Sequence, residues 1–299
     1  KKSKKYTFVM EKRKNGIIFF LMEQNTAIVN RNRVMYAANR MQLQIRHFAR
    51  GVFPRARGEI TALPFNRFFL PIANPDGASC YIRDGAKEYE LRPGFAYFIP
   101  IYHPAGVRLS EDLRFLSIQF TIEVVEGVDL FSRAHAVREI EDPGWLAQAE
   151  RAFDTPSLYV AASRLRCVTQ EFITFLLGDG SGEELEFVTR FAEFQPELDY
   201  IQNHCTAATT VEELAALRKT RREPFPRKFP AATGIPPKEL LTQAVLNRAG
   251  NLLLRGNYRV REVAFELGFS NEFYFSRFFK KHTGMPPHRF KELYGHPEI

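Results

Sequence analysis

Two thirteen-residue segments in the last quarter of the chain repeat one pattern, and this repeat constrains the fold more than any other feature. FPRKFPAATGIPP covers residues 225–237 and FSRFFKKHTGMPP covers residues 275–287. Seven of the thirteen positions are identical, including the Thr-Gly and Pro-Pro pairs. Gly suits the end of a helix, where the backbone turns left-handed, and Pro prevents the helix from continuing. The chain therefore contains two copies of a unit that ends in a helix.

The second copy is intact and predicts a helix-turn-helix. Residues 260–267 carry apolar side chains at helical spacing, and Gly268 follows where the helix must stop. Ser270 is the expected N-cap of the next helix. In that helix Phe275, Phe278 and Phe279 can face inward, which leaves Arg277, Lys280 and Lys281 for solvent or a ligand. Two helices with a basic outer face on the second are typical of a DNA-binding motif.

The second copy closely resembles the second DNA-binding motif of the AraC/XylS family of bacterial transcription regulators. The residues that carry this resemblance are Val263-Ala264, Gly268-Phe269-Ser270, Tyr274-Phe275-Ser276-Arg277, Phe279-Lys280-Lys281, Thr283-Gly284 and Pro287. That family has two such motifs joined by one helix, and residues 236–255 look like the joining helix. The resemblance implies base contacts from Asn271, Glu272, Phe273, Ser276 and Arg277, and phosphate contacts from Lys280 and Lys281.

The first copy departs from the family pattern. Its turn has Arg218, Lys219 and Arg221 where the family has a small residue, a glycine and a helix cap. We expect Pro224 at the first position of the second helix and Pro226 at the third, where neither removes an intrahelical hydrogen bond. Pro230 would fall in mid-helix, at a cost of about 3 kcal/mol. The first motif is predicted to be the weaker one, with DNA contacts from Arg221, Arg222 and Arg227.

The charge distribution supports a polyanion partner for the C-terminal region. Residues 1–57 carry 14 Lys and Arg against 2 acidic residues, and residues 58–213 carry 12 against 25. Residues 214–291 carry 16 against 5. A basic region beside an acidic one indicates binding of a polyanion, here double-stranded DNA.

We expect an α+β fold with two domains. Residues 41–180 read as short strands, with a hairpin at Asp84-Gly85, followed by a helical segment. They resemble the family's effector-sensing domain, a cupin-like antiparallel β-barrel followed by helices. Residues 183–295 are the expected all-α DNA-binding domain, with helix-turn-helix motifs at about 210–234 and 260–284. Residues 1–40 are a basic extension, for which a disordered arm and a non-native segment both stay open.

The resemblance to an effector-sensing domain implies a small-molecule ligand, with carbohydrates as one class. It places Arg67, Tyr97 and His103 among the polar contacts of that ligand. The apolar helix face in residues 158–176 fits either the barrel or a second subunit, so a homodimer stays open. RNA polymerase is a further partner that a transcription regulator of this class would contact.

Enzymatic and membrane functions find no support in the sequence. No two of the seven histidines are separated by one residue, so the His-x-His pair of cupin metal sites is absent. We expect no catalytic residues, no metal and no cofactor. The alternative is a cupin-fold enzyme or small-molecule-binding protein with a basic helical appendage. The three scattered cysteines indicate a cytoplasmic protein. The apolar run at 17–22 is much shorter than the roughly 20 residues of a membrane span.

Overall fold

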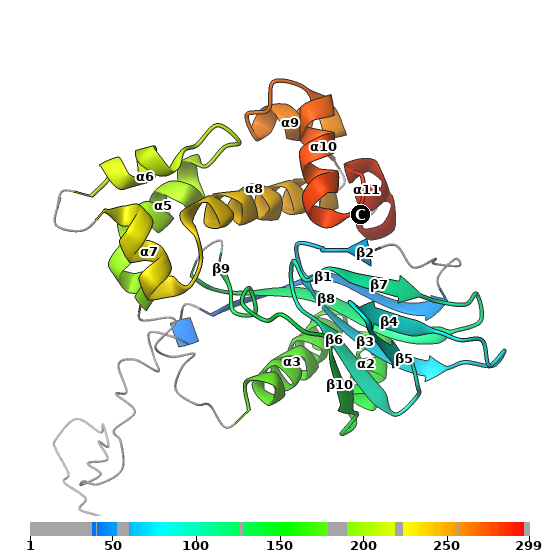
Figure 1. Ribbon diagram of the computed structural model, residues 1–299. Coiled ribbons are helices and arrows are strands. Elements are labelled where there is room, and N and C mark those ends of the chain that lie inside the picture. Colours follow the sequence, from blue (N-terminus) through cyan, green and yellow to red (C-terminus); the bar gives the residue numbers. More distant parts are fainter. Residues whose placement is uncertain are drawn as a thin grey trace, which may run out of the picture. The chain divides into compact units, whose positions relative to one another are not determined.

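The computed structural model describes residues 38–39, 41–52, 60–125, 128–178, 190–218, 224–255 and 257–295. Residues 40–299 form one compact unit in which strands come first and helices follow (Figure 1). The strands are β1 (Gln42–Val52), β2 (Ile60–Thr61), β3 (Asn66–Ala73), β4 (Tyr81–Asp84), β5 (Lys87–Glu90), β6 (Phe95–Ile99), β7 (Ala105–Arg108), β8 (Arg114–Val125), β9 (Val128–Asp129) and β10 (Arg138–Glu141). The helices are α2 (Trp145–Phe153), α3 (Leu158–Leu177), the short η1 (Ala192–Phe194), α5 (Gln195–His204), α6 (Val211–Ala216), α7 (Phe225–Thr233), α8 (Pro237–Leu254), α9 (Val260–Glu266), α10 (Glu272–Thr283) and α11 (Pro287–Tyr294).

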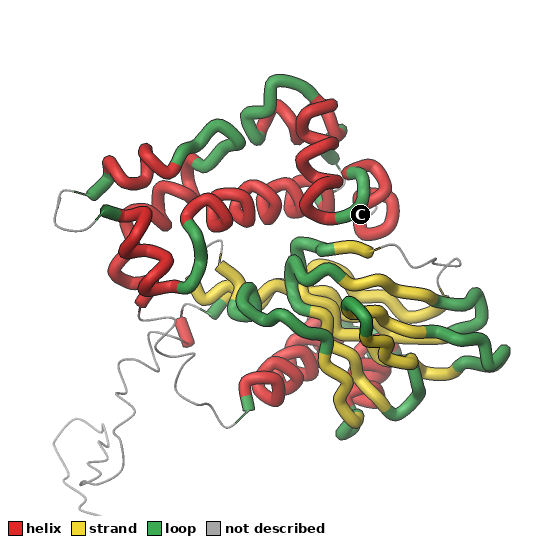
Figure 2. The backbone as a smooth tube through the Cα atoms, viewed as in Figure 1, coloured by secondary structure: helices red, strands yellow, loops and turns green. Residues whose placement is uncertain are grey.

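The strands divide between two antiparallel sheets (Figure 2). The larger sheet has the order β1-β8-β3-β6-β10, with β9 paired to β8, and the smaller has the order β2-β7-β4-β5. The expected hairpin is confirmed, because Asp84 pairs with Lys87 and Gly85 has a φ of 59°. The antiparallel region followed by helices matches the expected fold. The described strands, however, form two separately hydrogen-bonded sheets instead of one closed barrel.

Strand β3 lies inside the larger sheet and is covered on both faces. Phe68 and Leu70 belong to the core that α2 and α3 complete, whereas Phe69 belongs to the core between the two sheets. A strand buried on both faces needs apolar side chains at successive positions. This explains why FNRFFLPIA shows so little of the alternation that a half-exposed strand would have.

Helix α3 packs on the larger sheet through its C-terminal half. Phe172 is fully buried and stacks on Phe68 with ring centroids 3.6 Å apart. Trp145 contacts the Phe172 ring edge-on, with centroids 5.0 Å apart. At the N-terminal end, Leu158 and Tyr159 are 76% and 87% exposed. This chain's own sheet therefore covers only part of the predicted apolar face.

Helix α8 joins the pair α6 and α7 to the pair α9 and α10 (Figure 1). All the side chains predicted for its apolar side are buried: Leu240, Leu241, Val245, Ala249, Leu252 and Leu253. The joining helix is thus confirmed. Among the described residues, none of the helices combines the length and the apolar character that crossing a membrane requires.

Candidate DNA interface and effector site

The second helix-turn-helix consists of α9, a tight turn and α10. Gly268 occupies the turn with a φ of 76°, and a Cβ there would lie 3.0 Å from the Thr206 Cβ. The backbone N–H of Phe269 donates to the Ala264 carbonyl at 2.9 Å, which closes the end of α9. A left-handed residue without a side chain is required here, as the sequence predicted.

Helix α10 begins one residue later than expected. Its N-cap is Asn271 and not Ser270, because the Asn271 side-chain oxygen accepts the backbone N–H of Tyr274 at 3.0 Å. Asn and Ser are about equally good caps, so the residue types alone do not choose between them. The Asn271 oxygen is therefore engaged in holding the helix start, whereas Glu272 is exposed in the first turn.

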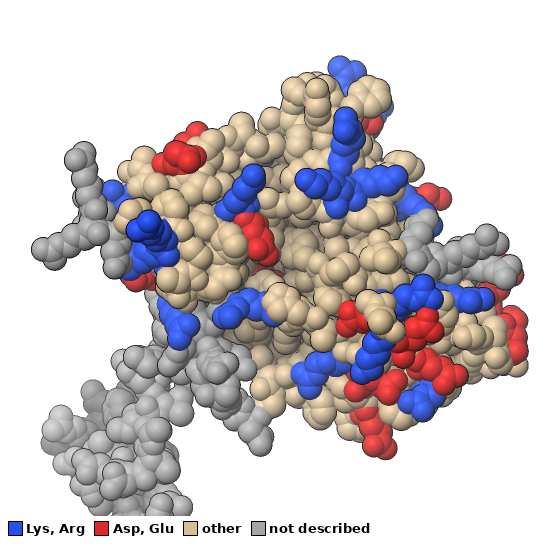
Figure 3. All heavy atoms as spheres, viewed as in Figure 1, with Lys and Arg blue, Asp and Glu red and all other residues tan. Residues whose placement is uncertain are grey.

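Helix α10 has one buried side and one exposed, basic side. Phe275, Phe279 and Thr283 are fully buried at intervals of four residues. Phe278, which was expected to face inward with them, is only half-buried. Figure 3 shows Lys and Arg side chains along this helix. The exposed predicted contacts are Glu272, Phe273, Arg277, Lys280 and Lys281, with Ser276 half-buried.

The first motif repeats this arrangement with a shorter second helix. Helix α6 starts at the predicted capping box, in which Thr210 and Glu213 each accept the other's backbone N–H at 3.2 Å. Helix α7 has nine residues, against twelve in α10. It begins at Phe225, which matches Phe275 in the repeat, the fourth residue of α10.

The first two prolines of this motif lie one position earlier in the helix than expected. Pro224 is the extended N-cap and Pro226 is the second residue, so neither removes an intrahelical hydrogen bond. Pro230 lies inside the helix, as expected, and Gly234 ends the helix with a φ of 74°. Pro230 has no N–H to donate to the carbonyl four residues earlier.

Ion pairs engage basic residues around α7. Lys228 pairs with Glu193, and the Arg218 Nε lies 2.7 Å from a carboxylate oxygen of Glu197. Arg227 is exposed on α7. The other predicted contacts of this motif, Arg221 and Arg222, lie outside the described residues.

Known proteins match the helical region. Residues 214–292 match the family described as "Helix-turn-helix domain". The chain is 32% identical over 78 residues to the HTH-type transcriptional activator Btr of Bacillus subtilis (strain 168). It is 30% identical over 92 residues to the uncharacterized HTH-type transcriptional regulator YobQ of the same organism. These matches cover 26% and 31% of this chain, and 15% and 38% of the two relatives. The chain thus spans well under half the length of either relative.

Residues 214–292 form an AraC-type helix-turn-helix domain.

The fold outside this AraC-type domain is also found in a solved structure. An apo structure of a ToxT variant from Vibrio cholerae has a TM-score of 0.54, covering 85% of this chain and 98% of that chain at 11% identity. A ToxT structure with a bound unsaturated fatty acid has a TM-score of 0.50, covering 86% and 98% at 12% identity. The likeness shows a common arrangement of a sheet region followed by helices.

Two of the three predicted effector contacts, Tyr97 and His103, have hydrogen-bond partners within the chain. The Tyr97 hydroxyl donates to the Glu90 carbonyl and accepts the Arg92 N–H at 3.1 Å. The His103 Nε2 lies 2.8 Å from the Asp84 carboxylate. Both side chains are thus engaged within the sheet region itself.

Arg67 differs, because part of its guanidinium group has no hydrogen-bond partner among the described residues. Arg67 is 8% exposed, and its Nη1 and Nη2 contact Thr61 at 3.3 and 3.5 Å. The Nε makes no hydrogen bond with the described residues, and burial lowers the pKa of Arg67 to about 10. Gln119 is its partner in register on β8, and the buried Gln119 Oε1 also makes no hydrogen bond within the described part of the chain. Within the described residues, an open donor and an open acceptor thus occupy paired, buried positions on β3 and β8.

Asn66, the residue before Arg67, takes part in a buried group of hydrogen bonds around the Asp129 carboxylate, which the sequence did not predict. The Asn66 side-chain amide donates to both oxygens of Asp129 at 3.0 Å, although the two residues are 63 positions apart. Asp129 also accepts the backbone N–H groups of Ile122 and Phe131, at 2.7 and 2.8 Å. Burial raises the pKa of Asp129 to about 6. The Asn66 oxygen accepts the Ile101 N–H at 2.9 Å, which fixes the turn after β6.

That turn contacts the joining helix of the AraC-type domain. Tyr102 is the one non-glycine residue with a positive φ, 57°, in the described ranges. Its hydroxyl lies 3.0 Å from the Gln243 carbonyl oxygen and also contacts the Asn247 side-chain oxygen, both on α8. A left-handed backbone is unfavourable for a side chain of this size. The contact with α8 and the Asn66 bond therefore hold Tyr102 in a conformation that it would not adopt alone.

A second contact joins strand β2 to the end of α10. The Ala62 N–H donates to the Thr283 carbonyl at 2.9 Å, and a Cβ on Gly284 would lie 2.2 Å from the Ile60 carbonyl oxygen. The sheet region thus touches the AraC-type domain both at its joining helix and at the C-terminal end of the second recognition helix.

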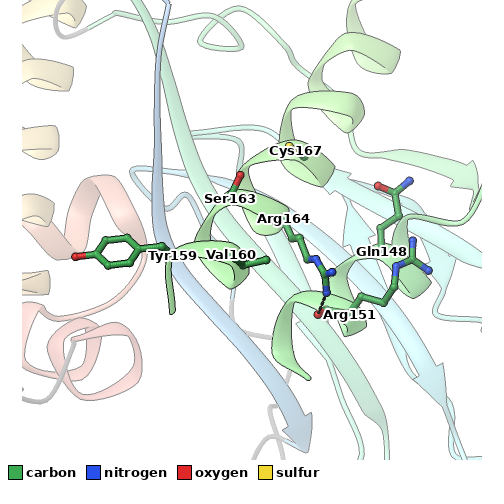
Figure 4. Close-up of a pocket in the computed structure, with 7 residues that line it drawn as sticks. All are labelled: Gln148, Arg151, Tyr159, Val160, Ser163, Arg164 and Cys167. Atoms are coloured by element: carbon green, nitrogen blue, oxygen red, sulfur yellow. Dashed lines mark hydrogen bonds between the residues drawn. The ribbon is translucent and has the colours of Figure 1, made fainter. Parts of the chain in front are cut away.

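A surface hollow lies between α2 and α3 (Figure 4). Arg164 reaches from α3 to the backbone carbonyl of Arg151 at 3.1 Å, which ties the two helices together. Tyr159 points away from the other labelled side chains in Figure 4. The hollow is lined by Gln148, Arg151, Tyr159, Val160, Ser163, Arg164 and Cys167. In the part of the chain that the structure describes, no three His, Cys, Asp or Glu side chains are grouped as a metal site would need.

Proposed function

We propose that the chain is a sequence-specific regulator of transcription that binds double-stranded DNA and responds to a small molecule. The exposed basic side of α10, opposite its packed phenylalanines, is the observation that carries this proposal. An α-helix is about as wide as the major groove, so such a side can reach the base edges. The similarity to regulators such as Btr supports a binding role and not an enzymatic one.

The proposal gives each predicted DNA contact of α10 a role. Glu272, Phe273, Ser276 and Arg277 face the bases, while Lys280 and Lys281 contact phosphates. Asn271 contributes by capping the helix, with any base contact left to its amide nitrogen. In the first motif, Arg221, Arg222 and Arg227 supply secondary phosphate contacts. The second motif therefore provides most of the sequence preference.

Replacing Arg277 by Ala is expected to weaken binding to the preferred DNA site by about 1–3 kcal/mol and to relax the preference at one base pair. An exposed arginine in this register can form two hydrogen bonds with a guanine, and Ala forms neither. The site is first selected from a random duplex library, and affinities are then measured by fluorescence anisotropy with the full chain.

Arg83 provides a matched control, because it is an exposed arginine on β4 in the sheet region. Arg83→Ala removes the same charge and is expected to leave both affinity and base preference close to the parent. Equal losses in the two variants would show that only net charge matters, and an unchanged Arg277→Ala would remove α10 from the interface.

We place the effector at Arg67 and Gln119, on the face of β3 and β8 where their open donor and acceptor lie. This site is adjacent in sequence to Asn66, whose bond to the Ile101 N–H fixes the turn that carries Tyr102. Through Tyr102 and α8, a ligand at Arg67 would bias the position of the DNA-binding motifs. Sugars are one effector class to screen, and the fatty acid bound to ToxT makes carboxylates the second.

A ligand of this site is expected to raise the melting temperature of the full chain, because it binds only the folded state. A thermal-shift screen of sugars and fatty acids identifies it, and Arg67→Lys serves as the matched variant. Lys keeps the charge but lacks the fork of the guanidinium group. We expect the variant to lose most of the ligand-induced shift. A ligand that stabilises both proteins equally would place the effector site elsewhere.

The remaining partners follow from the same proposal. The exposed end of α3, with Leu158 and Tyr159, is the surface on which a homodimer would form. A regulator bound near a promoter would also meet RNA polymerase. It would act in the compartment that holds the DNA, in keeping with the cytoplasmic location expected from the scattered cysteines.

A further inference from the structure

The Phe273 ring is exposed to solvent on the side of α10 that is proposed to face DNA. Phe273 is 82% exposed, and the neighbouring Tyr274 and the nearby Phe265 of α9 are 60% and 55% exposed. Single exposed apolar side chains are common and need no explanation. Here, however, three large aromatic side chains of one helix-turn-helix motif are exposed. Of the three, Phe273 lies on the side of α10 that is proposed to face DNA.

Helix geometry puts Phe273 and Arg277 on the same side of α10. Residues four apart lie one above the other, about 6 Å apart along the axis. The buried residues Phe275 and Phe279 lie on the other side of the helix. Tyr274 is turned by about 100° from Phe273 and does not share this line. Phe273 therefore accompanies the arginine that is proposed to contact a base.

Resting on the proposed function, we infer that Phe273 reads the C5-methyl group of a thymine in the major groove. A phenyl ring makes no hydrogen bond to a base edge, and the thymine methyl is the apolar group that the major groove presents. Arg277 on the same line prefers the O6 and N7 acceptors of guanine. With about 3.4 Å per base pair, 6 Å of helix spans about two base pairs. The preferred site thus contains a thymine within two base pairs of the guanine read by Arg277.

The charges around Phe273 favour DNA over a protein partner. Arg277 and Lys280 are exposed on the same side of α10, and Lys281 follows. Basic side chains around an aromatic ring suit a polyanion that also presents an apolar group, as DNA does at thymine. A ring inserted between base pairs as a wedge is the other way in which DNA can accept Phe. A wedge does not depend on the thymine methyl, so replacing thymine by uracil distinguishes a wedge from a methyl contact.

Replacing thymine by uracil tests the inference, because uracil keeps the pairing edge and lacks only the methyl group. In the site selected with the full chain, each thymine is replaced in turn by deoxyuridine, and affinity is measured by anisotropy. At one position, the parent is expected to lose about fourfold in affinity, the effect of one buried methyl group. At that position, Phe273→Ala is expected to bind the thymine and uracil duplexes equally well.

Tyr274→Ala is the matched control, because it removes an exposed aromatic ring one residue away. It is expected to keep the fourfold response of the parent. If no uracil position weakens the parent, or if Phe273→Ala responds as the parent does, the inference is overturned. A change in oligomeric state of Phe273→Ala without a change in uracil response would overturn it in favour of a protein partner. These failures leave a selected site and its dependence on Arg277 in place. Selection of no site at all would overturn the proposed function itself.

Discussion

Replacing Asp129 by Ala is expected to lower the free energy of unfolding by at least about 3 kcal/mol, since each unsatisfied buried donor costs about 1–3 kcal/mol. The carboxylate is 2% exposed and accepts hydrogen bonds from the Asn66 amide and from the backbone N–H groups of Ile122 and Phe131. Ala leaves all three donors without this partner. Water entering the cavity would satisfy some of them, which places the estimate at the low end of the summed range. Urea denaturation of parent and variant at about pH 4, where the stabilisation by this group is complete, measures the difference.

Asp142 is a matched control for this substitution. Its carboxylate also accepts three backbone N–H groups, from Gly144, Trp145 and Leu146, but it is half-buried and open to water. Asp142→Ala is expected to cost about 1 kcal/mol, as for other caps of a helix start. Similar losses at both positions would contradict the view that burial decides the cost.

The same carboxylate is expected to make stability depend on pH in an unusual direction. Burial raises the pKa of Asp129 to about 6 from its ordinary 3.8, so the folded chain holds the proton more tightly than the unfolded chain. Stability from this group is therefore fully present below about pH 4 and is lost as the pH rises through 6, by about 3 kcal/mol. Asp129→Asn cannot titrate. The free energy of unfolding of the parent minus that of the variant should fall between about pH 4 and pH 6. If this difference does not change with pH, the raised pKa of Asp129 is wrong.

The second helix-turn-helix could be predicted from the sequence because its signals are local. Gly268 and Gly284 mark helix ends within a few residues of the helices that they close, and Phe275 and Phe279 set the buried side by their spacing. The prediction of Ser270 as the N-cap of α10 was wrong for an equally local reason, since Ser270 and Asn271 are both good N-cap residues. Strand β3 was harder, because burial on both faces removes the alternation that indicates a strand.

The polar cluster at Asp129 could not be predicted, because its partners come from distant parts of the chain. Nothing near Asn66 indicates that its amide meets a carboxylate 63 residues later. The effector contacts expected from family resemblance stay a prediction. The sequence did not indicate that the Tyr97 hydroxyl would bond the Glu90 carbonyl or that His103 would meet the Asp84 carboxylate. Sequence identifies polar residues of a sheet, whereas the pairing of strands decides which of them remain open.

Replacing Pro230 by Ala is expected to stabilise the first motif, because the helix runs through the proline from Phe225 to Thr233. Ala restores the backbone N–H and removes the clash of the ring with the Pro226 carbonyl, which together cost about 3 kcal/mol in a helix interior. Losing a proline also frees the unfolded chain, which offsets about 0.4–1 kcal/mol of this gain. The expected net gain is about 2 kcal/mol in the free energy of unfolding, measured by urea denaturation.

Pro226 is the matched control within the same helix. It is the second residue of α7, where no intrahelical N–H bond is lost, so Pro226→Ala is expected to leave stability unchanged or slightly lower. Pro230→Lys copies Lys280 of the second motif, and it should add about 0.9 to the salt slope of DNA binding if the new side chain contacts a phosphate. Pro230→Ala separates that added charge from the repair of the helix. If Pro230→Ala is no more stable than Pro226→Ala, the proline does not weaken α7. The lesser role of the first motif would then have to come from its shorter second helix. Pro224 matches Tyr274 in the repeat, but Tyr274 lies in the first turn of α10 whereas Pro224 precedes α7, so the first motif lacks that turn of exposed side chains.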